Sequence, residues 1–237
     1  MRRLKHRLKS LRNDAEVRSK PADDDPRRLI DTVPTDLARI AEETRAYKSS
    51  GQLLVYGQEF APFRDAAFTI LEIGVKDGGS VALWSRYFSR AKIVGVDIRP
   101  RETHEVDRIT MLQGDQSDTA FIERLADEHG PFGIIIDDGS HVPAHQIATF
   151  EALFPHLMAG GLYICEDIHT SLTKFTDEPS ALDYFQTFVG RLMVGAEKSG
   201  HPAPDVARHV YRVMFYWRSV LLQKLPLGPK YRVPPHA

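Results

Sequence analysis

Short apolar runs alternate with amphipathic segments along most of the chain. Five of these runs are rich in β-branched residues and too short for an ordinary helix, so each fits a strand buried on both faces of a sheet. The predicted strands are residues 68–74, 92–98, 109–112, 132–136 and 162–165. Apolar residues at helical spacing predict helices at residues 35–47, 81–88, 119–128, 144–157 and 181–198.

Residues 209–225 (HVYRVMFYWRSVLLQKL) are dominated by β-forming side chains and interrupted near Trp217. They predict two further short strands. Strands that alternate with helices and end in a strand pair predict a doubly wound α/β fold. We therefore expect a mostly parallel, seven-stranded Rossmann-like sheet with an antiparallel terminal strand. Residues 53–63 (LLVYGQEFAPF) are predicted to be irregular, and Gly160-Gly161 is expected to end the helix at 144–157.

The ends of the chain differ in composition from its body. Residues 1–20 carry eight Lys and Arg against two acids, and PADDDP at residues 21–26 interrupts the chain. We expect a basic tail and linker at 1–30, a helical capping segment at 31–67, a main domain at 68–226 and a proline-rich tail at 227–237. The basic tail has two interpretations, a solvated tail or an amphipathic helix on an anionic surface or partner subunit, which leaves a homo-oligomer open.

Overall composition narrows the class of protein. A hydrophobic content of 42% supports a full core, and a net charge of −1 gives no reason to expect nucleic-acid binding. The single cysteine, Cys165, lies in a predicted buried strand, so a reducing compartment fits. No apolar run reaches the ~20 residues of a membrane span. These features predict a cytoplasmic protein.

A glycine-rich turn follows the first predicted strand. The segment GVKDGGS (residues 74–80) leads into a predicted helix, an arrangement in which glycines let the backbone approach a ligand. Asp97 ends the next strand, at the distance where an acid typically binds a ribose diol. Asp115 follows the third strand, where it reaches an adenine amino group or simply starts a helix. The glycine-rich turn and Asp97 together favour nucleoside binding over the alternative that Asp97 is simply a surface acid at a strand end.

Acidic residues also follow two predicted strands that we expect to be neighbours. Asp137 and Asp138 come after the strand at 132–136, and Glu166 and Asp167 come after the strand at 162–165. Carboxyl ends of parallel strands meet at one edge of a sheet, where ligands bind. Four carboxylates crowded there repel one another unless a cation is present. With His141, they form the candidate active site.

Three reaction classes deserve comparison. A nicotinamide dehydrogenase has the wrong glycine spacing here and needs no acidic cluster. Zinc hydrolysis is suggested by His141 and His145, but Pro143 fits the first helical position, which leaves His141 outside the helix. Group transfer from a nucleoside-containing donor, with a metal holding the acceptor, uses every feature.

The motifs carry a family resemblance over roughly residues 53–226. LEIGVKDGGS, QGDQSD, GPFGIIIDDGSH, ALFPH, GGLYICED and FYWRSVLLQK resemble class I S-adenosylmethionine-dependent methyltransferases. Within them, the pairing of DDGSH with GGLYICED is similar to macrocin/mycinamicin-type sugar O-methyltransferases and, more distantly, to the cephalosporin hydroxylase group. The region before the first strand does not show that family's auxiliary domain.

The resemblance implies a function and a site. It implies O-methylation of a sugar hydroxyl on a glycosylated small molecule, either a secondary metabolite or a glycolipid, with S-adenosylmethionine as donor and Mg²⁺ or another divalent cation. A non-sugar hydroxyl acceptor and a catalytically silent partner subunit are the alternatives. By resemblance His141 is the general base and Asp138, Glu166 and Asp167 hold the metal, so that Asp138 also serves catalysis. The implied donor-binding residues are Tyr56, Glu72, Gly74, Gly78, Asp97, Asp115, Gln116 and Asp137.

Overall fold

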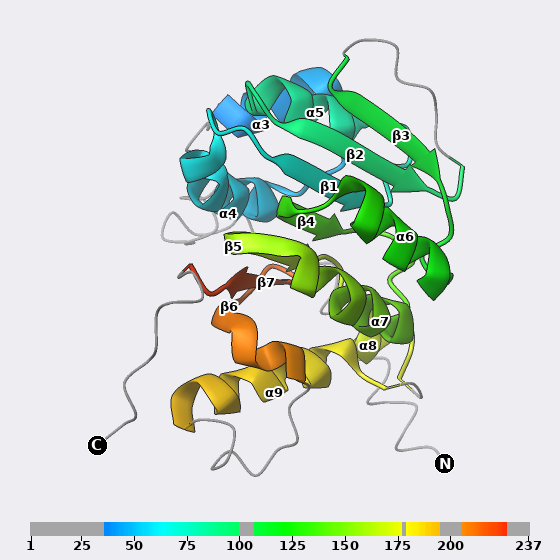
Figure 1. Cartoon of the computed structure of the whole chain (residues 1–237), viewed down its shortest axis with the longest axis vertical. Helices are drawn as coiled ribbons and strands as arrows, with labels where there is room; N and C mark the ends of the chain where they lie inside the picture. The colour runs from blue at the N-terminus through cyan, green and yellow to red at the C-terminus, as the bar shows by residue number, and fades with distance from the viewer. Residues whose placement is uncertain (1–35, 100–106, 177–178, 195–204, 227–237) are drawn as a thin grey trace, which may run out of the picture. The chain divides into compact units, whose positions relative to one another are not determined.

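A seven-stranded sheet runs through the computed structural model, which describes residues 36–99, 107–176, 179–194 and 205–226. The strands are β1 Thr69–Ile73, β2 Lys92–Asp97, β3 Ile109–Gln113, β4 Phe132–Asp137, β5 Leu157–Cys165, β6 Val210–Tyr216 and β7 Ser219–Lys224. Their order is β3-β2-β1-β4-β5-β7-β6, as Figure 1 shows. Strands β1 to β5 are parallel, and β7 runs antiparallel between β5 and β6. The predicted fold class is confirmed.

Helices cover both faces of the sheet (Figure 1). They are α3 Asp36–Thr44, α4 Ser50–Phe60, α5 Gly79–Tyr87, α6 Thr119–His129, α7 Pro143–Leu153, the single turn α8 Thr170–Thr173 and α9 Ala181–Val194. Helices α3, α4 and α5 bury their apolar side chains against one face, and α6, α7 and α9 against the other. The short 3-10 helices are Ala61–Phe63, Phe154–His156 and Asp205–His209.

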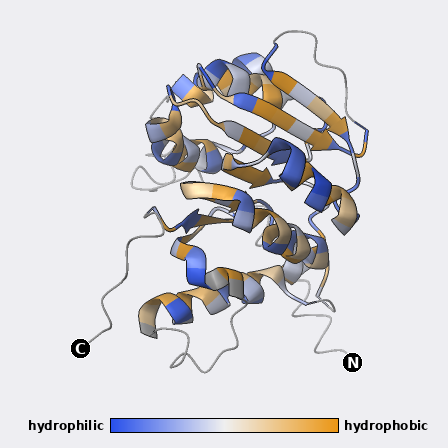
Figure 2. Ribbon diagram, viewed as in Figure 1, coloured by the Kyte–Doolittle hydropathy of each residue, from blue (hydrophilic) through white to orange (hydrophobic). Residues whose placement is uncertain are grey.

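Central strands are buried on both faces, as their apolar composition predicts. Successive β1 side chains alternate: Ile70 packs with α3, α4 and α5, whereas Leu71 packs with α6, α7 and α9. All six residues of β4 are buried. Figure 2 shows these strands as largely hydrophobic ribbon in the interior. The strands are almost entirely apolar, so packing does not explain the carboxylates at their ends. These carboxylates therefore mark a candidate functional site.

The structure corrects the prediction for residues 53–63. Most of this segment belongs to helix α4, which Ser49 caps: the Ser49 side chain accepts from the Gln52 backbone, and the Gln52 side chain accepts from the Ser49 backbone. This reciprocal capping box starts a helix. Ser49, Ser50 and Gly51 therefore begin α4, whereas α3 already ends at Thr44, before the predicted end of the helix at residue 47.

The predicted helix at 144–157 is shorter than expected. Helix α7 ends at Leu153, because Pro155 has no backbone N–H to donate and disfavours helical geometry in the residue before it. Gly160 and Gly161 lie inside β5 and do not end the helix. An added Cβ on Gly161 would lie 2.9 Å from the Gly133 carbonyl oxygen, so glycine lets β5 approach β4 closely.

The predicted basic tail and linker at 1–30 and the proline-rich tail at 227–237 lie outside the described residues. The helix predicted at 181–198 is described as far as Val194. Within the described ranges, no helix is long and apolar enough to cross a membrane.

Candidate functional site

The carboxyl ends of β1 and β4 meet at the centre of the sheet edge. Gly74, which follows β1, has a φ of 88°, and an added Cβ there would lie 2.1 Å from the Asp138 carbonyl oxygen. The Asp138 N–H donates to the Ile73 carbonyl at 2.9 Å. Gly78, also at positive φ, precedes the first residue of α5. Glycine is therefore required where the chain turns tightly beside the candidate site.

Two adjoining cavities open at this edge and share Gly74, Asp97 and Gly139. The larger, of about 430 Å³, is lined by Tyr47, Lys48, Gly74, Val75, Lys76, Asp77, Ser80, Asp97, Asp138, Gly139, His141 and Asp167. The smaller, of about 170 Å³, is lined by Ile73, Gly74, Asp97, Ile98, Gly114, Asp115, Gln116, Gly139 and Ser140. Of the predicted donor residues, Gly74, Asp97, Asp115 and Gln116 line these cavities, and the predicted catalytic residues Asp138 and His141 line the larger one. Tyr56, Glu72, Gly78 and Asp137 are not among the residues that line either cavity.

Asp97 is held at the junction of the two cavities by backbone N–H groups. Its Oδ2 accepts from Lys76 and its Oδ1 from Arg99, each at 2.8 Å. Asp115 is exposed at the smaller cavity, and hydrogen bonds from the Ser117 backbone and hydroxyl lower the pKa of its carboxyl. Asp115 and one oxygen of Asp97 are therefore oriented by backbone N–H groups two residues away, and the other oxygen of Asp97 by the turn that follows β1.

Gln116 and Asp137 form a buried link beneath the smaller cavity. Gln116 Nε2 donates to Asp137 Oδ1 at 2.7 Å, and Gln116 Oε1 accepts from the Ser140 N–H at 2.8 Å. Burial raises the pKa of the fully buried Asp137 to about 7, although its hydrogen bonds, including the one from Tyr163, oppose this. These contacts fix the loop that follows β4.

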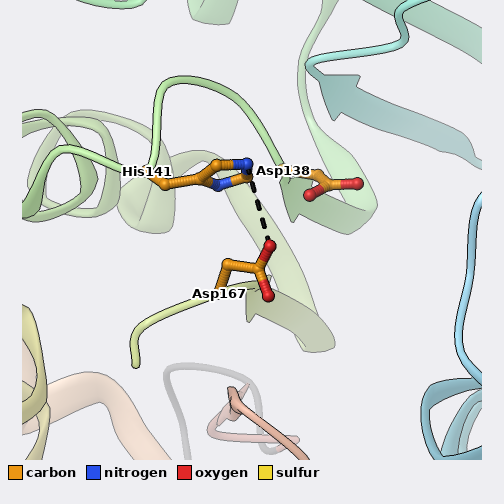
Figure 3. Close-up of side chains that lie close together, drawn as sticks. All are labelled: Asp138, His141 and Asp167. Carbon is orange, nitrogen blue, oxygen red and sulfur yellow. Dashed lines mark ion pairs between the residues drawn. The ribbon is translucent and has the colours of Figure 1, made fainter. Parts of the chain in front are cut away.

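Figure 3 shows Asp138, His141 and Asp167 gathered at the larger cavity. One potential metal-binding atom from each residue lies within 4.8 Å of the others. His141 and Asp167 have φ values of 56° and 53°, in the left-handed region that residues other than glycine rarely adopt. Such backbone strain is typical of functional sites.

His141 has the properties of a base that is neutral at physiological pH. Burial lowers the pKa of its imidazole, although Asp167 and Glu166 oppose that effect. His141 Nε2 lies 3.8 Å from Asp167 Oδ2. Nδ1 is buried and has no hydrogen-bond partner among the described residues. His145, by contrast, lies in α7 and contacts Ser140 Oγ through Nδ1 at 3.0 Å.

Glu166 is buried next to this cluster and contacts α4. Its carboxylate accepts from Tyr56 Oη at 2.6 Å and from the Gln52 side chain. Tyr56 is fully buried in α4 and stacks on Phe60. The predicted donor contact of Tyr56 and the predicted metal contact of Glu166 stay predictions, and the structure adds that these two residues touch each other.

Lys48 is a site residue that the sequence analysis did not identify. Its side chain is 1% exposed, and Nζ lies 2.7 Å from Asp138 Oδ2, 2.7 Å from Glu166 Oε1 and 3.1 Å from Glu72 Oε1. Burial alone would lower the pKa of Lys48, but Glu166, Glu72 and Asp138 together raise it well above its ordinary value. Lys48 is therefore held as a cation among Glu72, Asp138 and Glu166, although burial and Glu166 raise the pKa of the Asp138 carboxyl to about 8 and Lys48 opposes this.

Glu72 is the innermost of these carboxylates. It is fully buried in β1, and its Oε2 accepts from the indole N–H of Trp84 in α5 at 2.9 Å. Its predicted donor contact stays a prediction.

The residues present fit a hard divalent cation. Asp138 and Glu166 direct oxygens to one cationic position, now taken by the Lys48 ammonium, and Asp167 adds a carboxylate next to them. Oxygen ligands are those that Mg²⁺ prefers. The two cavities fit a nucleoside, because both are lined by Asp97, which can accept from hydroxyl groups, and by Gly74, which has no side chain.

Comparisons with known proteins agree with this geometry. A family model described as a methyltransferase domain matches residues 71–168. The 8-demethyl-8-alpha-L-rhamnosyl tetracenomycin-C 2'-O-methyltransferase of Streptomyces olivaceus is 49% identical over 185 residues, covering 71% of this chain and 49% of that protein. The demethylmacrocin O-methyltransferase of Streptomyces fradiae is 42% identical over 186 residues, covering 71% and 47%. The chain thus spans about half the length of the curated relatives it matches.

A solved structure shows the same fold. It is the MycE methyltransferase from the mycinamycin biosynthetic pathway in complex with Mg, SAH and mycinamycin VI. The TM-score is 0.72 and the identity 31%, covering 80% of this chain and 53% of that one. The resemblance predicted from the motifs is confirmed.

Proposed function

We propose that this chain, whose residues 71–168 form a methyltransferase domain, moves a methyl group from S-adenosylmethionine to a sugar hydroxyl on a glycosylated small molecule. The relatives that support this proposal are named for O-methylation of rhamnosyl tetracenomycin-C and demethylmacrocin. A solved structure 31% identical to this chain contains Mg and SAH. A donor, a divalent cation and a sugar acceptor are therefore the components to test.

One observation carries the proposal. The larger cavity is lined by Asp97 from the end of β2 and by Asp138, His141 and Asp167 from the segments that follow β4 and β5. A nucleoside held at Asp97 would extend its sulfonium methyl group along the cavity toward these three residues. Methyl transfer depends largely on aligning the attacking oxygen with the methyl group and its leaving sulfur.

The donor would be bound by residues at the carboxyl ends of β1, β2 and β3. Asp97 accepts hydrogen bonds from the ribose hydroxyls, because its two oxygens are already oriented by backbone N–H groups. Asp115 lies at the smaller cavity with Ile98, where an adenine ring would lie against the apolar side chain and offer its amino group to the carboxylate. Gln116 holds the floor of this cavity through Ser140 and Asp137.

Asp138, Asp167 and Glu166 would hold the divalent cation. A bound divalent cation makes a coordinated hydroxyl more acidic. His141 takes the hydroxyl proton on Nε2, the nitrogen that is near Asp167, as the oxygen attacks the methyl group. The Asp167 carboxylate then stabilises the imidazolium that forms. Burial keeps the imidazole neutral, and so able to accept a proton, to a lower pH than usual.

The test is methyl transfer with a matched set of acceptors. Protein, Mg²⁺ and S-adenosylmethionine with an isotopically labelled methyl group are incubated with rhamnosylated polyketides, other deoxysugar glycosides and the corresponding sugar-free aglycones. Mass spectrometry should find the label on the sugar fragment of a glycoside and none on the aglycone. Chelator should stop the reaction and added Mg²⁺ restore it. Label on aglycones alone would replace the sugar acceptor with another hydroxyl, and no label on any hydroxyl compound would refute the proposal.

A further inference from the structure

Lys48 joins parts of the site that are far apart in the sequence. It lies in the short connection between α3 and α4, and it is 90 residues from Asp138 and 118 residues from Glu166. The Lys48 ammonium bridges these two carboxylates at 2.7 Å each. It therefore takes the position between them that a divalent cation would need.

A third carboxylate gives the ammonium a second position. Glu72 Oε1 lies 3.1 Å from Lys48 Nζ and accepts no hydrogen bond from the described residues. The other oxygen of Glu72 is fixed by the Trp84 indole at 2.9 Å. A shift of the flexible lysine stem toward Glu72 would shorten this ion pair and supply the hydrogen bond that Oε1 lacks.

Glu166 keeps its place when Lys48 shifts. Tyr56 Oη donates to Glu166 Oε1 at 2.6 Å, and the Gln52 side chain donates to Oε2. Both donors come from α4, and the backbone N–H of Glu166 is bound to the Asp137 carbonyl at 2.8 Å. The carboxylate of Glu166 thus stays aimed at the same position with or without the ammonium.

We propose that Lys48 is a positioning residue that keeps the Asp138 and Glu166 carboxylates together before a divalent cation binds, then yields their oxygens and moves onto Glu72. This inference rests on the metal-dependent proposed function and adds a competitor for the metal position. An ammonium and a divalent cation crowded on the same carboxylate oxygens repel each other, so each lowers the affinity of the site for the other. The metal affinity then depends partly on the free energy needed to move the Lys48 ammonium from Asp138 and Glu166 onto Glu72.

Direct measurement of bound Mn²⁺ tests the exchange. Mn²⁺ replaces Mg²⁺ as an oxygen-binding ion, and its free concentration is read by electron paramagnetic resonance without donor, acceptor or turnover. Lys48→Met removes the competing ammonium and should tighten Mn²⁺ binding by about tenfold or more. Lys76→Met, which removes an exposed lysine lining the same cavity, is the matched control and should change the affinity by less than about threefold. An unchanged or weaker affinity in Lys48→Met would overturn the exchange, because a merely structural lysine gives no gain of affinity.

Glu72→Gln tests the second position of the ammonium. It removes the charge that receives Lys48, so Mn²⁺ binding should weaken. The loss should be clearly smaller in the Lys48→Met background, where no ammonium has to move. Equal losses in both backgrounds would overturn the exchange. The double variant Lys48→Met/Glu72→Gln also has no unpaired Glu72 charge, so it serves if the single lysine variant fails to fold, and it should then bind Mn²⁺ more tightly than Glu72→Gln.

The outcomes separate this inference from the proposed function. Equal Mn²⁺ affinity in the unaltered protein and Lys48→Met, with sugar-dependent methyl transfer intact, refutes the exchange alone. No Mn²⁺ bound by any variant, with methyl transfer that survives chelator, refutes metal dependence and this inference together.

Discussion

The two halves of the site edge are built in different ways. At the ends of β2 and β3, Asp97 and Asp115 are oriented by backbone N–H groups, from Lys76 and Arg99 for the first and from Ser117 for the second. At the ends of β4 and β5, the carboxylates contact Lys48, Gln52 and Tyr56 from a segment more than 80 residues away. The first half, the nucleoside half, is partly exposed and mostly determined by local backbone groups. The second, the carboxylate half, is largely buried and depends on packing against residues distant in the sequence.

This difference predicts how substitutions act. A change in the nucleoside half should alter ligand affinity and leave folding stability nearly unchanged, because few buried partners lose contacts. A change in the carboxylate half should alter chemistry, stability or both, because buried charges lose their partners. His141 lines the cavity, so its substitution should alter chemistry and leave folding stability nearly unchanged.

The largest expected effect is that of His141→Ala. General-base catalysis typically contributes about 10²–10⁴-fold, so kcat should fall by a factor in that range while donor affinity is unchanged. In the unaltered protein, kcat should fall as pH drops through the histidine pKa, which burial places below its usual value. Steady-state kinetics over a range of pH measures both.

His145→Ala is the matched control for this prediction. His145 lies four residues away in α7 and contacts Ser140, so its loss should leave most of the activity. Near-normal turnover of His141→Ala with an unchanged pH profile would assign proton removal to another group.

The next effect is on stability. Lys48→Ala removes the ammonium from three carboxylates, and breaking a buried charge network in this way costs about 3–5 kcal/mol. Urea unfolding without metal should show the loss, and Glu72→Gln in the same chain should restore part of it. A stability unchanged by Lys48→Ala would mean that water, not packing, surrounds these charges.

A smaller effect is expected in the nucleoside half. Asp97→Ala should weaken binding of S-adenosylmethionine by about 1.5–3 kcal/mol, the value of a hydrogen bond to a charged group. The free energy of unfolding should stay within about 0.5 kcal/mol, since Asp97 is held only by surface backbone groups. Calorimetry measures the loss of donor affinity, and urea unfolding of the same preparation measures the change in folding stability. A large loss of stability would contradict the proposed contrast between the halves.

The smallest effect concerns Asp137 and pH. Its pKa in the folded protein is about 7, whereas in the unfolded chain an aspartate titrates near ~4. A raised folded pKa means that its contribution to stability is complete below about pH 4 and is lost as pH rises through 7. Asp137→Asn should therefore show less loss of stability over that interval, by roughly 1–3 kcal/mol after relaxation of the site. Urea unfolding at a series of pH values measures the difference, and parallel curves for the two proteins would contradict it.

The fold was predictable because local patterns report it directly. Strands β1 to β5 include the apolar runs, since a strand buried on both faces carries few polar residues. Glu72 in β1 is an exception, and β5 begins at Leu157, before its apolar run. The start of α4 was missed although Ser49 and Gln52 stand at the capping-box spacing. That signal is short and overlapped with the end of α3.

The sequence predicted that Asp97, Asp138, His141 and Asp167 would lie at one edge of the sheet, because each follows a strand of a parallel sheet or the turn after it. The structure brings these four residues to one cavity, and their roles stay predictions. Lys48 had no such signal. It belongs to a short connection without a motif, and only the folded chain brings it to Glu166, 118 residues away.

The left-handed backbone at His141 and Asp167 has a consequence for protein engineering. Only glycine adopts such φ values freely, with asparagine, aspartate and histidine next. If both codons were randomised and the library sorted for folded protein alone, these four amino acids should already be enriched before any selection for activity. Depletion of alanine or valine at position 141 would then record a conformational preference of the chain. A glycine variant at that position relieves the preference while removing the imidazole, so its comparison with His141→Ala separates the conformational from the chemical contribution of the side chain.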